Sequence, residues 1–361
     1  MKINFLVPTT GLTGGIKVIF EHANNLTRWN HEINIIYPYV LHQDADWKEE
    51  IIGRLKKIRR FFLEIIGQNR IKWFDLDPRI RIIRVLNLSV KHIPDADVTV
   101  ATANETADWL AYYPLSKGQK FYFIQDYEIW TRPQKEVDAT WKMPLKKIVI
   151  ASWLKELAER KFNEKIYGIV PDGIDFKKFH NENKFFHKNK RILMMYHILE
   201  KKGFRDGIEA FKIAKQKHPE IEITLFGAYK PGVEVPKNIK FYYQPSSEKL
   251  RELYSTSDVF LWSSRVEGFG IPPMEAMACK CAVISTDTGA IRDYAIPNET
   301  VVIAPPAESH LMAEKLIELI ENKEKLKKIS LAGYEKIKEF DCERFSRRLE
   351  KIFLNEINKI N

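Results

Sequence analysis

The 361-residue sequence has little of what marks secreted, fibrous or membrane-spanning proteins. Three cysteines, Cys279, Cys281 and Cys342, are too few to staple a chain of this length, which indicates a reduced, intracellular protein. The 16 glycines and 17 prolines follow no collagen-like period. No run of about 18 apolar residues is present, so we expect no membrane-spanning helix. The first apolar run stops at Pro8 and is too short for a secretion signal, which predicts a cytoplasmic protein.

What is present is a globular composition, with 45% hydrophobic and 29% charged residues and a length that suits two domains. Lysine and arginine number 58 against 48 acidic residues, so the net charge is +10. This excess favours an anionic partner, such as nucleic acid, a phospholipid surface or a phosphorylated small molecule. Half of it lies between Lys48 and Lys72, where eight basic residues stand against three acidic ones.

Within this basic region, Ile51–Ile66 follows a helical period, with apolar residues on one face and basic residues at its borders. Such a helix suits an anionic membrane surface, which would make the protein peripheral on the inner face of the cell membrane. An ordinary domain helix packed on a sheet explains the pattern as well, and both interpretations stay open. Nucleic acid is not expected, because Phe61 and Phe62 lie with the aliphatic residues and do not alternate with the basic ones.

Strand-like apolar runs alternate with amphipathic helical runs along most of the chain, which predicts a parallel α/β architecture. Residues 1–170 and 191–335 are expected to form one domain each, joined by a polar hinge or linker at 171–190. Residues 336–361 are expected to form a helix that packs back on the first domain. The predicted strands are Ile3–Val7, Ile33–Tyr37, Ile80–Val85, Val98–Ala101, Phe121–Ile124, Lys147–Ala151, Arg191–Met195, Glu222–Phe226, Ile239–Tyr242, Val259–Trp262, Ala282–Ser285 and Val301–Ile303.

The most informative segment is the loop that follows the predicted strand ending at Trp262. It contains two glycines and leads to Pro272 and Pro273, which suit the first turn of a helix. Free N–H groups at Gly270 and Ile271 would then form a helix N-terminus that can bind phosphate.

Two carboxylates flank this loop, Glu267 before it and Glu275 in what we expect to be the first helical turn. Folding of the loop could bring them to opposite ends of one ligand, where each accepts hydrogen bonds from sugar hydroxyls without a metal. The alternative is that Glu275 only complements the helix dipole and that Glu267 is a solvated loop residue.

The segment from Glu267 to Tyr294, EGFGIPPMEAMACKCAVISTDTGAIRDY, resembles the signature of the retaining family-4 glycosyltransferases of GT-B fold. Further motifs match in order over nearly the whole chain. They are Gly14-Gly15 before an amphipathic helix to Trp29, Asn30-His31-Glu32, Ala151-Ser152, Val170–Asp175, Lys202-Gly203, Leu225–Gly227 and Tyr254–Val259. The resemblance implies two Rossmann-like domains facing across a cleft.

The resemblance also implies a role for each matching residue. Glu275 would bind the ribose of a nucleotide diphosphate-sugar, Glu267 the hydroxyls of its sugar, and Lys202 its diphosphate. Glu267 and Lys202 are the expected catalytic residues. The expected donor-binding residues are Glu275, Gly14, Gly15, Gln125, Asp126, His197, Gly227, Tyr243, Phe269, Gly270 and Ile271.

Two positions depart from the family pattern. His197 stands where an arginine is usual, so a titratable group replaces a permanent cation, and we expect donor affinity to fall as pH rises through the imidazole pKa. Gln125-Asp126 stands where His-Asp is usual, and glutamine cannot relay a proton. The form Phe123–Glu128, FIQDYE, resembles a subgroup that builds cell-surface polysaccharides.

Together these features predict a retaining, hexosyl-type glycosyltransferase that acts on a glycan or lipid-linked acceptor. A nucleotide-sugar-binding scaffold without activity, and a sugar-nucleotide epimerase or phosphorylase, remain as alternatives. We expect no cofactor and no metal, because the triplets Asp44–Asp46, Asp75–Asp77 and Asp95–Asp97 do not follow a hydrophobic strand.

Overall fold

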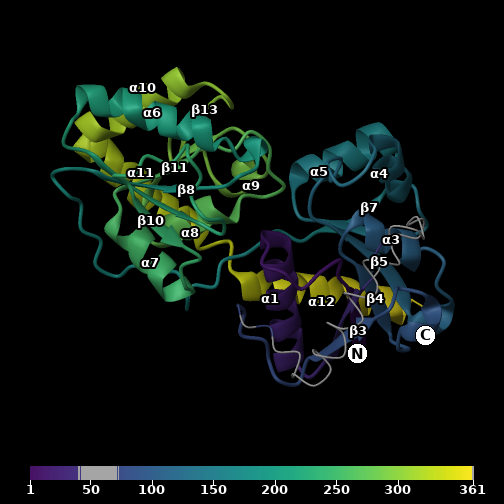
Figure 1. Ribbon diagram of the computed structural model, residues 1–361. Coiled ribbons are helices and arrows are strands. Elements are labelled where there is room, and N and C mark those ends of the chain that lie inside the picture. The colour runs from purple at the N-terminus through teal and green to yellow at the C-terminus, as the bar shows by residue number, and fades with distance from the viewer. Residues whose placement is uncertain (40, 42–70, 72, 360–361) are drawn as a thin grey trace. The chain divides into compact units, whose positions relative to one another are not determined.

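The computed structural model describes residues 1–39, 41, 71 and 73–359, which form two compact α/β units (Figure 1). Unit 1 comprises Met1–Ile150, Leu154–Val170 and Ser346–Asn361, and unit 2 comprises Ala151–Trp153 and Pro171–Phe345. The predicted basic helix Ile51–Ile66 lies outside the described residues. Of the helices that the structure does describe, none has the length and apolar character needed to cross a membrane.

Unit 1 is built on a seven-stranded parallel sheet with the order β3-β2-β1-β4-β5-β6-β7. The order reverses between β1 and β4, and in open α/β sheets ligands bind outside the carboxyl ends of the strands at such a switch point. The strands are β1 Lys2–Leu6, β2 Glu32–Pro38, β3 Arg81–Val85, β4 Val98–Ala101, β5 Gln119–Ile124, β6 Lys146–Val149 and β7 Ile166–Ile169. The helices are α1 Gly14–Arg28, α3 Asn104–Leu110, α4 Gln134–Trp141, α5 Ser152–Leu157 and α12 Cys342–Asn358.

Unit 2 is built on a six-stranded parallel sheet with the order β10-β9-β8-β11-β12-β13, so its switch point lies between β8 and β11. The strands are β8 Arg191–Met195, β9 Glu222–Gly227, β10 Lys240–Tyr243, β11 Val259–Trp262, β12 Ala282–Thr286 and β13 Val302–Ala304. The helices are α6 Phe204–Lys217, α7 Ser247–Thr256, α8 Ile271–Ala278, α9 Ile291–Tyr294, α10 Ser309–Glu321 and α11 Lys323–Ile337. The sheet and its helices bury one aliphatic core, which includes Ile192, Leu225 and Leu261.

All of the predicted strands are present within two residues at their ends, and the α/β prediction is confirmed. One strand, β7, was missed, because its four residues include Gly168 and carry no clear period. Helix α12 packs closely on this glycine: a Cβ at Gly168 would lie 2.5 Å from Ile352 Cδ1, the end of a flexible side chain. This contact comes from a segment nearly two hundred residues away, which the local sequence pattern cannot reveal.

The C-terminal part of α12 packs in unit 1 beside α1 (Figure 1). The Phe353 ring lies 4.8 Å from the Phe121 ring, centroid to centroid. Polar contacts join the two helices: His22 Nδ1 lies 2.8 Å from Ser346 Oγ, and Asn25 Nδ2 donates to the same oxygen at 3.0 Å. The C-terminal helix is therefore part of the first unit's core.

His22 makes unit 1 sensitive to acid. The ring is buried, and burial lowers its pKa to about 4 from the ordinary value of 6.5. Between these values the unfolded chain binds a proton that the folded protein does not, so stability falls as pH decreases from 6.5 to about 4, by about 3 kcal/mol in all. We expect His22→Gln to remove most of this dependence, which urea unfolding of unit 1 at pH 7 and pH 4.5 will measure. Equal pH dependence in both proteins would contradict the assignment.

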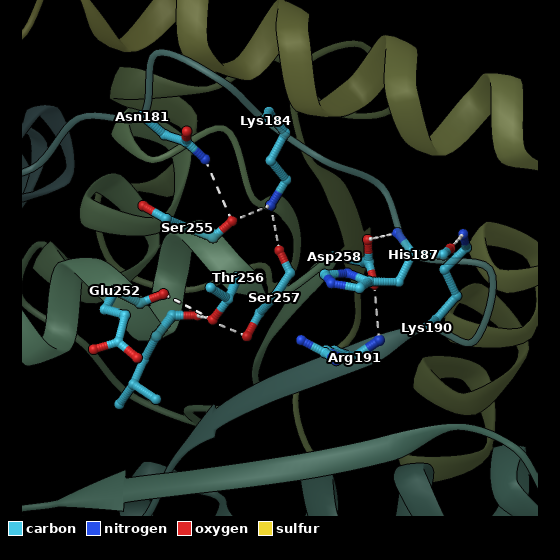
Figure 2. Close-up of polar contacts among 11 residues, drawn as sticks. Asn181, Lys184, His187, Lys190, Arg191, Glu252, Ser255, Thr256, Ser257 and Asp258 are labelled. Atoms are coloured by element: carbon cyan, nitrogen blue, oxygen red, sulfur yellow. Dashed lines mark hydrogen bonds and ion pairs between the residues drawn. The ribbon is translucent and has the colours of Figure 1, made fainter.

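The segment between β7 and β8 begins with irregular backbone at Pro171-Asp172-Gly173 and packs on the other elements of unit 2 (Figure 2). Asp258, which is fully buried, accepts hydrogen bonds from the backbone N–H groups of His187 and Arg191, both at 2.9 Å. Its second oxygen also lies 3.1 Å from His187 Nδ1. Lys184 Nζ donates to the carbonyl oxygens of Ser255 and Ser257. The polar stretch is thus held on the rest of unit 2 by hydrogen bonds of the Lys184 and Asp258 side chains.

Candidate functional site

Two loops meet at the switch point of unit 2, one after β8 and one after β11. The carbonyl oxygen of Lys201 accepts the N–H groups of Arg265 at 2.8 Å and Val266 at 3.2 Å. Ser263 Oγ donates to the carbonyl oxygen of Gly203 at 2.8 Å. These bonds fix the first loop against the second, at the edge of the sheet where a ligand is expected.

The two residues predicted to be catalytic, Lys202 and Glu267, are brought together here. Lys202 Nζ lies 2.7 Å from Glu267 Oε1 and 2.8 Å from Oε2. The Glu267 side chain is only 8% exposed, so the interpretation of this residue as a solvated loop carboxylate is wrong. A buried carboxylate that keeps its charge needs such a partner. Lys202 is thus a cation that can bind phosphate, and Glu267 beside it is an acceptor for hydroxyl groups.

Arg265 holds the loop that carries Lys202. Its Nε and Nη2 atoms donate to the two carboxylate oxygens of Asp206 at 2.7 and 2.9 Å, and Nη1 donates to Glu200 at 2.9 Å. A two-bonded guanidinium–carboxylate pair fixes geometry better than a lysine contact. Sequence reasoning did not single out this arginine, because its partners lie about sixty residues earlier and only the fold brings them together.

Glu275 lies in the second turn of α8, not in the first as expected, because the helix begins at Ile271. The dipole interpretation is weakened accordingly, since the effect fades beyond the first turn. The Glu275 side chain is buried, and Tyr254 donates to its Oε2 at 3.2 Å. A buried, oriented carboxylate of this kind can accept two hydroxyl groups of a ligand.

The start of α8 matches the predicted anion site in its backbone. Gly270 precedes the helix with φ +103°, a conformation that favours glycine, and two prolines follow in the first turn. The ring of Phe269 is buried and stacks on Tyr294 at 5.5 Å, centroid to centroid. Tyr294 also donates to the carbonyl oxygen of Gly270 at 3.1 Å. Phe269 therefore supports the loop with its ring, and the backbone of Gly270 and Ile271 is the part available to an anion.

Gly227 and Tyr243 end two neighbouring strands and pair with each other in the sheet register. A Cβ at Gly227 would lie 2.5 Å from the carbonyl oxygen of Tyr196, so only glycine fits. The Tyr243 side chain is about half exposed, at 48%. These two predicted donor-binding positions form a partly exposed, partly aromatic edge of the sheet.

His197 does not have the charge that we expected. Its pKa is lowered to about 4 by burial first, and then by the neighbouring ammonium groups of Lys202 and Lys201. Its Nδ1 accepts the backbone N–H of Leu199 at 3.0 Å, which leaves the ring neutral with the proton on Nε2. The lowered pKa moves the expected fall in donor affinity from the ordinary range near 6.5 to about pH 4, so in the absence of donor His197 is a neutral hydrogen-bonding group above about pH 5.

The predicted residues of unit 1 also meet at a switch point. Gly14 and Gly15 begin α1, whose cap Thr13 accepts the N–H of Ile16. A Cβ at Gly15 would lie 2.9 Å from Gln125 Oε1, so the glycine lets the helix start approach the end of β5. Asp126 follows and accepts the N–H of Tyr127 at 2.8 Å.

Two of the aspartate triplets are used in other contacts. Asp77 pairs with Arg79 at 2.7 Å, and Asp95 pairs with Lys117 at 2.7 Å. The third triplet, Asp44–Asp46, lies outside the described residues. In the described part of the chain, no group of three or more metal-ligating side chains is found.

A family model described as "Glycosyl transferases group 1" matches residues 175–336, which lie within unit 2 and include the Lys202–Glu267 pair and Glu275. A capsular polysaccharide biosynthesis glycosyltransferase, CapM of Staphylococcus aureus, is 26% identical over 200 residues, which are 50% of this chain and 52% of that protein. The chain spans about half the length of the curated relatives that it matches.

Solved structures resemble this chain over nearly its whole length. Sucrose-phosphate synthase from Thermosynechococcus elongatus has a TM-score of 0.74 at 16% identity, and covers 99% of each chain. The Anabaena protein HepE, solved in complex with UDP-glucose, has a TM-score of 0.74 at 14% identity over 98% of this chain and 100% of that one. These likenesses show the fold: two parallel α/β units of the GT-B type.

Proposed function

We propose that the protein is a glycosyltransferase that uses a nucleotide diphosphate-sugar. The proposal starts from the match of residues 175–336 to the family model of the group 1 glycosyl transferases. The observation that carries the proposal is the buried Lys202–Glu267 pair at the switch point of unit 2. It stands beside a helix start without side-chain capping at Gly270 and a buried carboxylate at Glu275. Lys202 and the helix start suit a diphosphate, Glu267 suits a sugar, and Glu275 suits a ribose.

The reaction develops negative charge on the departing nucleotide diphosphate. Lys202 and the N–H groups at Gly270 and Ile271 stabilise that charge where it forms. Glu267 exchanges its bond with Lys202 for hydroxyl groups of the sugar and positions the anomeric carbon. The acceptor hydroxyl attacks from the face that the leaving group vacates, its proton passes to the leaving phosphate, and the configuration is retained.

The transferred group is a hexose or a related sugar, and the acceptor is a glycan or a lipid-linked glycan of a cell-surface polysaccharide. The similarity to a capsular polysaccharide glycosyltransferase supports this assignment. A location in the cytoplasm, or on the inner face of the cell membrane, is part of this proposal. Membrane contact through Ile51–Ile66 stays a prediction.

Two measurements test the function. Thermal shift with a panel of UDP-, GDP-, dTDP- and ADP-sugars identifies the donor as the compound that raises Tm most. Analysis of the nucleotide and sugar products formed from that donor alone, with oligosaccharide acceptors and with phosphate then separates the alternatives. A transferase needs the acceptor, an epimerase turns over the donor alone, a phosphorylase needs phosphate, and a scaffold binds the donor without turnover.

Glu275→Gln is expected to raise the donor KM roughly tenfold and to leave kcat within about threefold. A ribose contact acts in the ground state and the transition state alike, so binding suffers and turnover does not. The glutamine oxygen can still accept the bond from Tyr254, which protects the fold. Glu299→Gln, an exposed change in the same unit, serves as the control. An unchanged donor KM would remove Glu275 from the site.

We also propose that catalysis needs no divalent metal, because Lys202 and backbone dipoles supply the positive charge. Activity is expected to stay within about twofold of the untreated enzyme in excess EDTA. Complete loss of turnover that Mg²⁺ restores would show that the diphosphate is held by a metal instead.

A further inference from the structure

Two buried side chains on different helices of unit 2 meet at the Glu275 carboxylate. Tyr254 lies in the last turn of α7, and Glu275 lies in the second turn of α8. Tyr254 is fully buried and Glu275 is 3% exposed, and the phenol hydroxyl donates to Glu275 Oε2 at 3.2 Å. A carboxylate can accept about four hydrogen bonds. The bond to Tyr254 is therefore compatible with two further bonds to the ribose hydroxyls of the proposed function.

Aromatic rings hold Tyr254 in one orientation. The rings of Phe226 and Phe260 lie 5.8 and 5.3 Å from the Tyr254 ring, centroid to centroid, and both meet it edge-on. The ring of Phe179, in the segment between β7 and β8, lies 6.2 Å from it. Burial raises the pKa of the Tyr254 phenol well above its usual value, and the charge of Glu275 raises it further. The hydroxyl therefore stays protonated and remains a hydrogen-bond donor.

The segment between β7 and β8 also fixes the two helices against each other. Asn181 Nδ2 donates to the carbonyl oxygen of Ser255, the residue after Tyr254, and to that of Cys279, the residue after α8, both at 3.3 Å. Figure 2 shows Asn181 and Lys184 directed at the same Ser255 carbonyl group. Carbonyl groups at a helix C-terminus have no partner within the helix, so side-chain donors can satisfy them. One amide thus joins the ends of the two helices.

A carboxylate that is held in this way distinguishes ribose from 2′-deoxyribose. If Glu275 were free to rotate, it would turn to water or to another donor when a ligand lacks one hydroxyl, and the loss of affinity would be small. With Oε2 tied to Tyr254, the side chain keeps its orientation, and a missing 2′-hydroxyl removes a partner that nothing replaces. A buried acceptor that loses its partner is costly, above all when it is charged.

We infer that Tyr254 is a positioning residue that fixes the Glu275 carboxylate and makes the donor site selective for ribonucleotides, with Asn181 holding the two helices together. The inference rests on the proposed function, because it takes Glu275 to bind the ribose of the donor. It deepens that function by naming the class of nucleotide. Ribonucleoside diphosphates bind more tightly than their 2′-deoxy forms, and Tyr254 is the reason.

The test compares UDP, GDP and ADP with their 2′-deoxy forms. Dissociation constants for the full chain are measured by isothermal titration calorimetry, and the base that binds most tightly is used for all variants. Wild-type protein should prefer the ribonucleotide by at least about tenfold. Tyr254→Phe keeps the ring and removes only the hydroxyl, so the preference should fall to about threefold or less, mainly because the ribonucleotide binds more weakly.

Two further variants examine how Tyr254 acts. Glu275→Ala should abolish the preference, and adding Tyr254→Phe to it should change neither affinity by more than about twofold, because the hydroxyl then has no carboxylate to orient. Asn181→Ala should lower the preference about threefold, and it tests the same geometry should Tyr254→Phe not fold. Circular dichroism and the apparent Tm check that each variant is folded.

Tyr334→Phe is the matched control. This tyrosine lies on α11 of the same unit, and its ring contacts the ammonium groups of Lys280 and Lys338, so it is not part of the candidate site. The variant loses a hydroxyl of the same kind and should bind both forms of the nucleotide as wild type does.

Three results would overturn the inference. The first is equal binding of both nucleotide forms by wild-type protein. The second is an equal loss of affinity for both forms in Tyr254→Phe, which a purely structural role would give. The third is an undiminished effect of Tyr254→Phe when Glu275 is already alanine.

Turnover of the donor with acceptor is measured on the same proteins. If wild-type protein turns over the donor while any of these three results is obtained, the inference fails and the proposed function stands. If no nucleotide binds and no donor is turned over, both fail.

Discussion

Glu267→Gln and Lys202→Ala are each expected to lower kcat/KM by roughly 10²-fold or more, the usual effect of removing one preorganised charged group from a reacting centre. The two side chains are ion-paired at 2.7 Å, and only 20% of the Lys202 side chain and 8% of the Glu267 side chain are exposed. Each therefore holds the other in place, and in the proposed mechanism each meets a different part of the donor. Steady-state kinetics with the identified donor and acceptor measure the effect.

The double variant distinguishes a working pair from two independent residues. If Lys202 and Glu267 act as a unit, Lys202→Ala with Glu267→Gln should be little worse than either change alone. Lys212→Ala, an exposed lysine on α6 of the same unit, should turn over normally. Turnover close to wild type in both single variants is incompatible with the proposed mechanism. Circular dichroism of each variant checks that the fold is kept.

Gly203→Ala is expected to disrupt the site by displacing the loop itself. Gly203 has φ +63°, and a Cβ there would lie 1.8 Å from the carbonyl oxygen of Ser263. The two switch-point loops would have to separate, which breaks the bond from Ser263 Oγ and moves Lys202 away from Glu267. We expect the apparent Tm of unit 2 to fall by roughly 10 °C and turnover to be lost.

The comparison for this variant is Gly11→Ala. A Cβ at Gly11 would contact only Thr9 Oγ1, at an ordinary 3.4 Å, and φ there is not in the left-handed region. Calorimetry and kinetics on the two variants separate a general glycine effect from the close approach at Gly203. Normal stability and turnover of Gly203→Ala would mean that the two loops are not held as tightly as the structure has them.

The sequence alone was sufficient for the sheet architecture, because central strands of a parallel sheet are buried on both faces and read as short apolar runs. The runs Val98–Ala101 and Val259–Trp262 coincide with β4 and β11. Strand β7 was missed because it has only four residues and one of them, Gly168, has no side chain to show a period.

The chemistry of the candidate site was visible in part. Glu267, Glu275 and Lys202 were identified because they lie in motifs that resemble those of a known family. Each motif can be recognised in the sequence without knowing which residues lie near it in space. The state of His197 was not visible, since its pKa depends on burial and on the ammonium groups of Lys201 and Lys202 around it. Electrostatic shifts of this kind arise only when charges from separate segments share a space with little water.

By itself, the sequence determined the α/β class, the strand positions and the residue types able to bind a nucleotide diphosphate-sugar, because these follow from local periodicity and from residue chemistry. Only the tertiary structure decided which of these residues meet. It joined Lys202 to Glu267 across sixty-five residues and brought Gly15 against Gln125 at the other switch point. The reason is physical: parallel strands are connected through helices, so residues that share the carboxyl edge of a sheet are separated along the chain by whole elements, and their pairing follows from strand order.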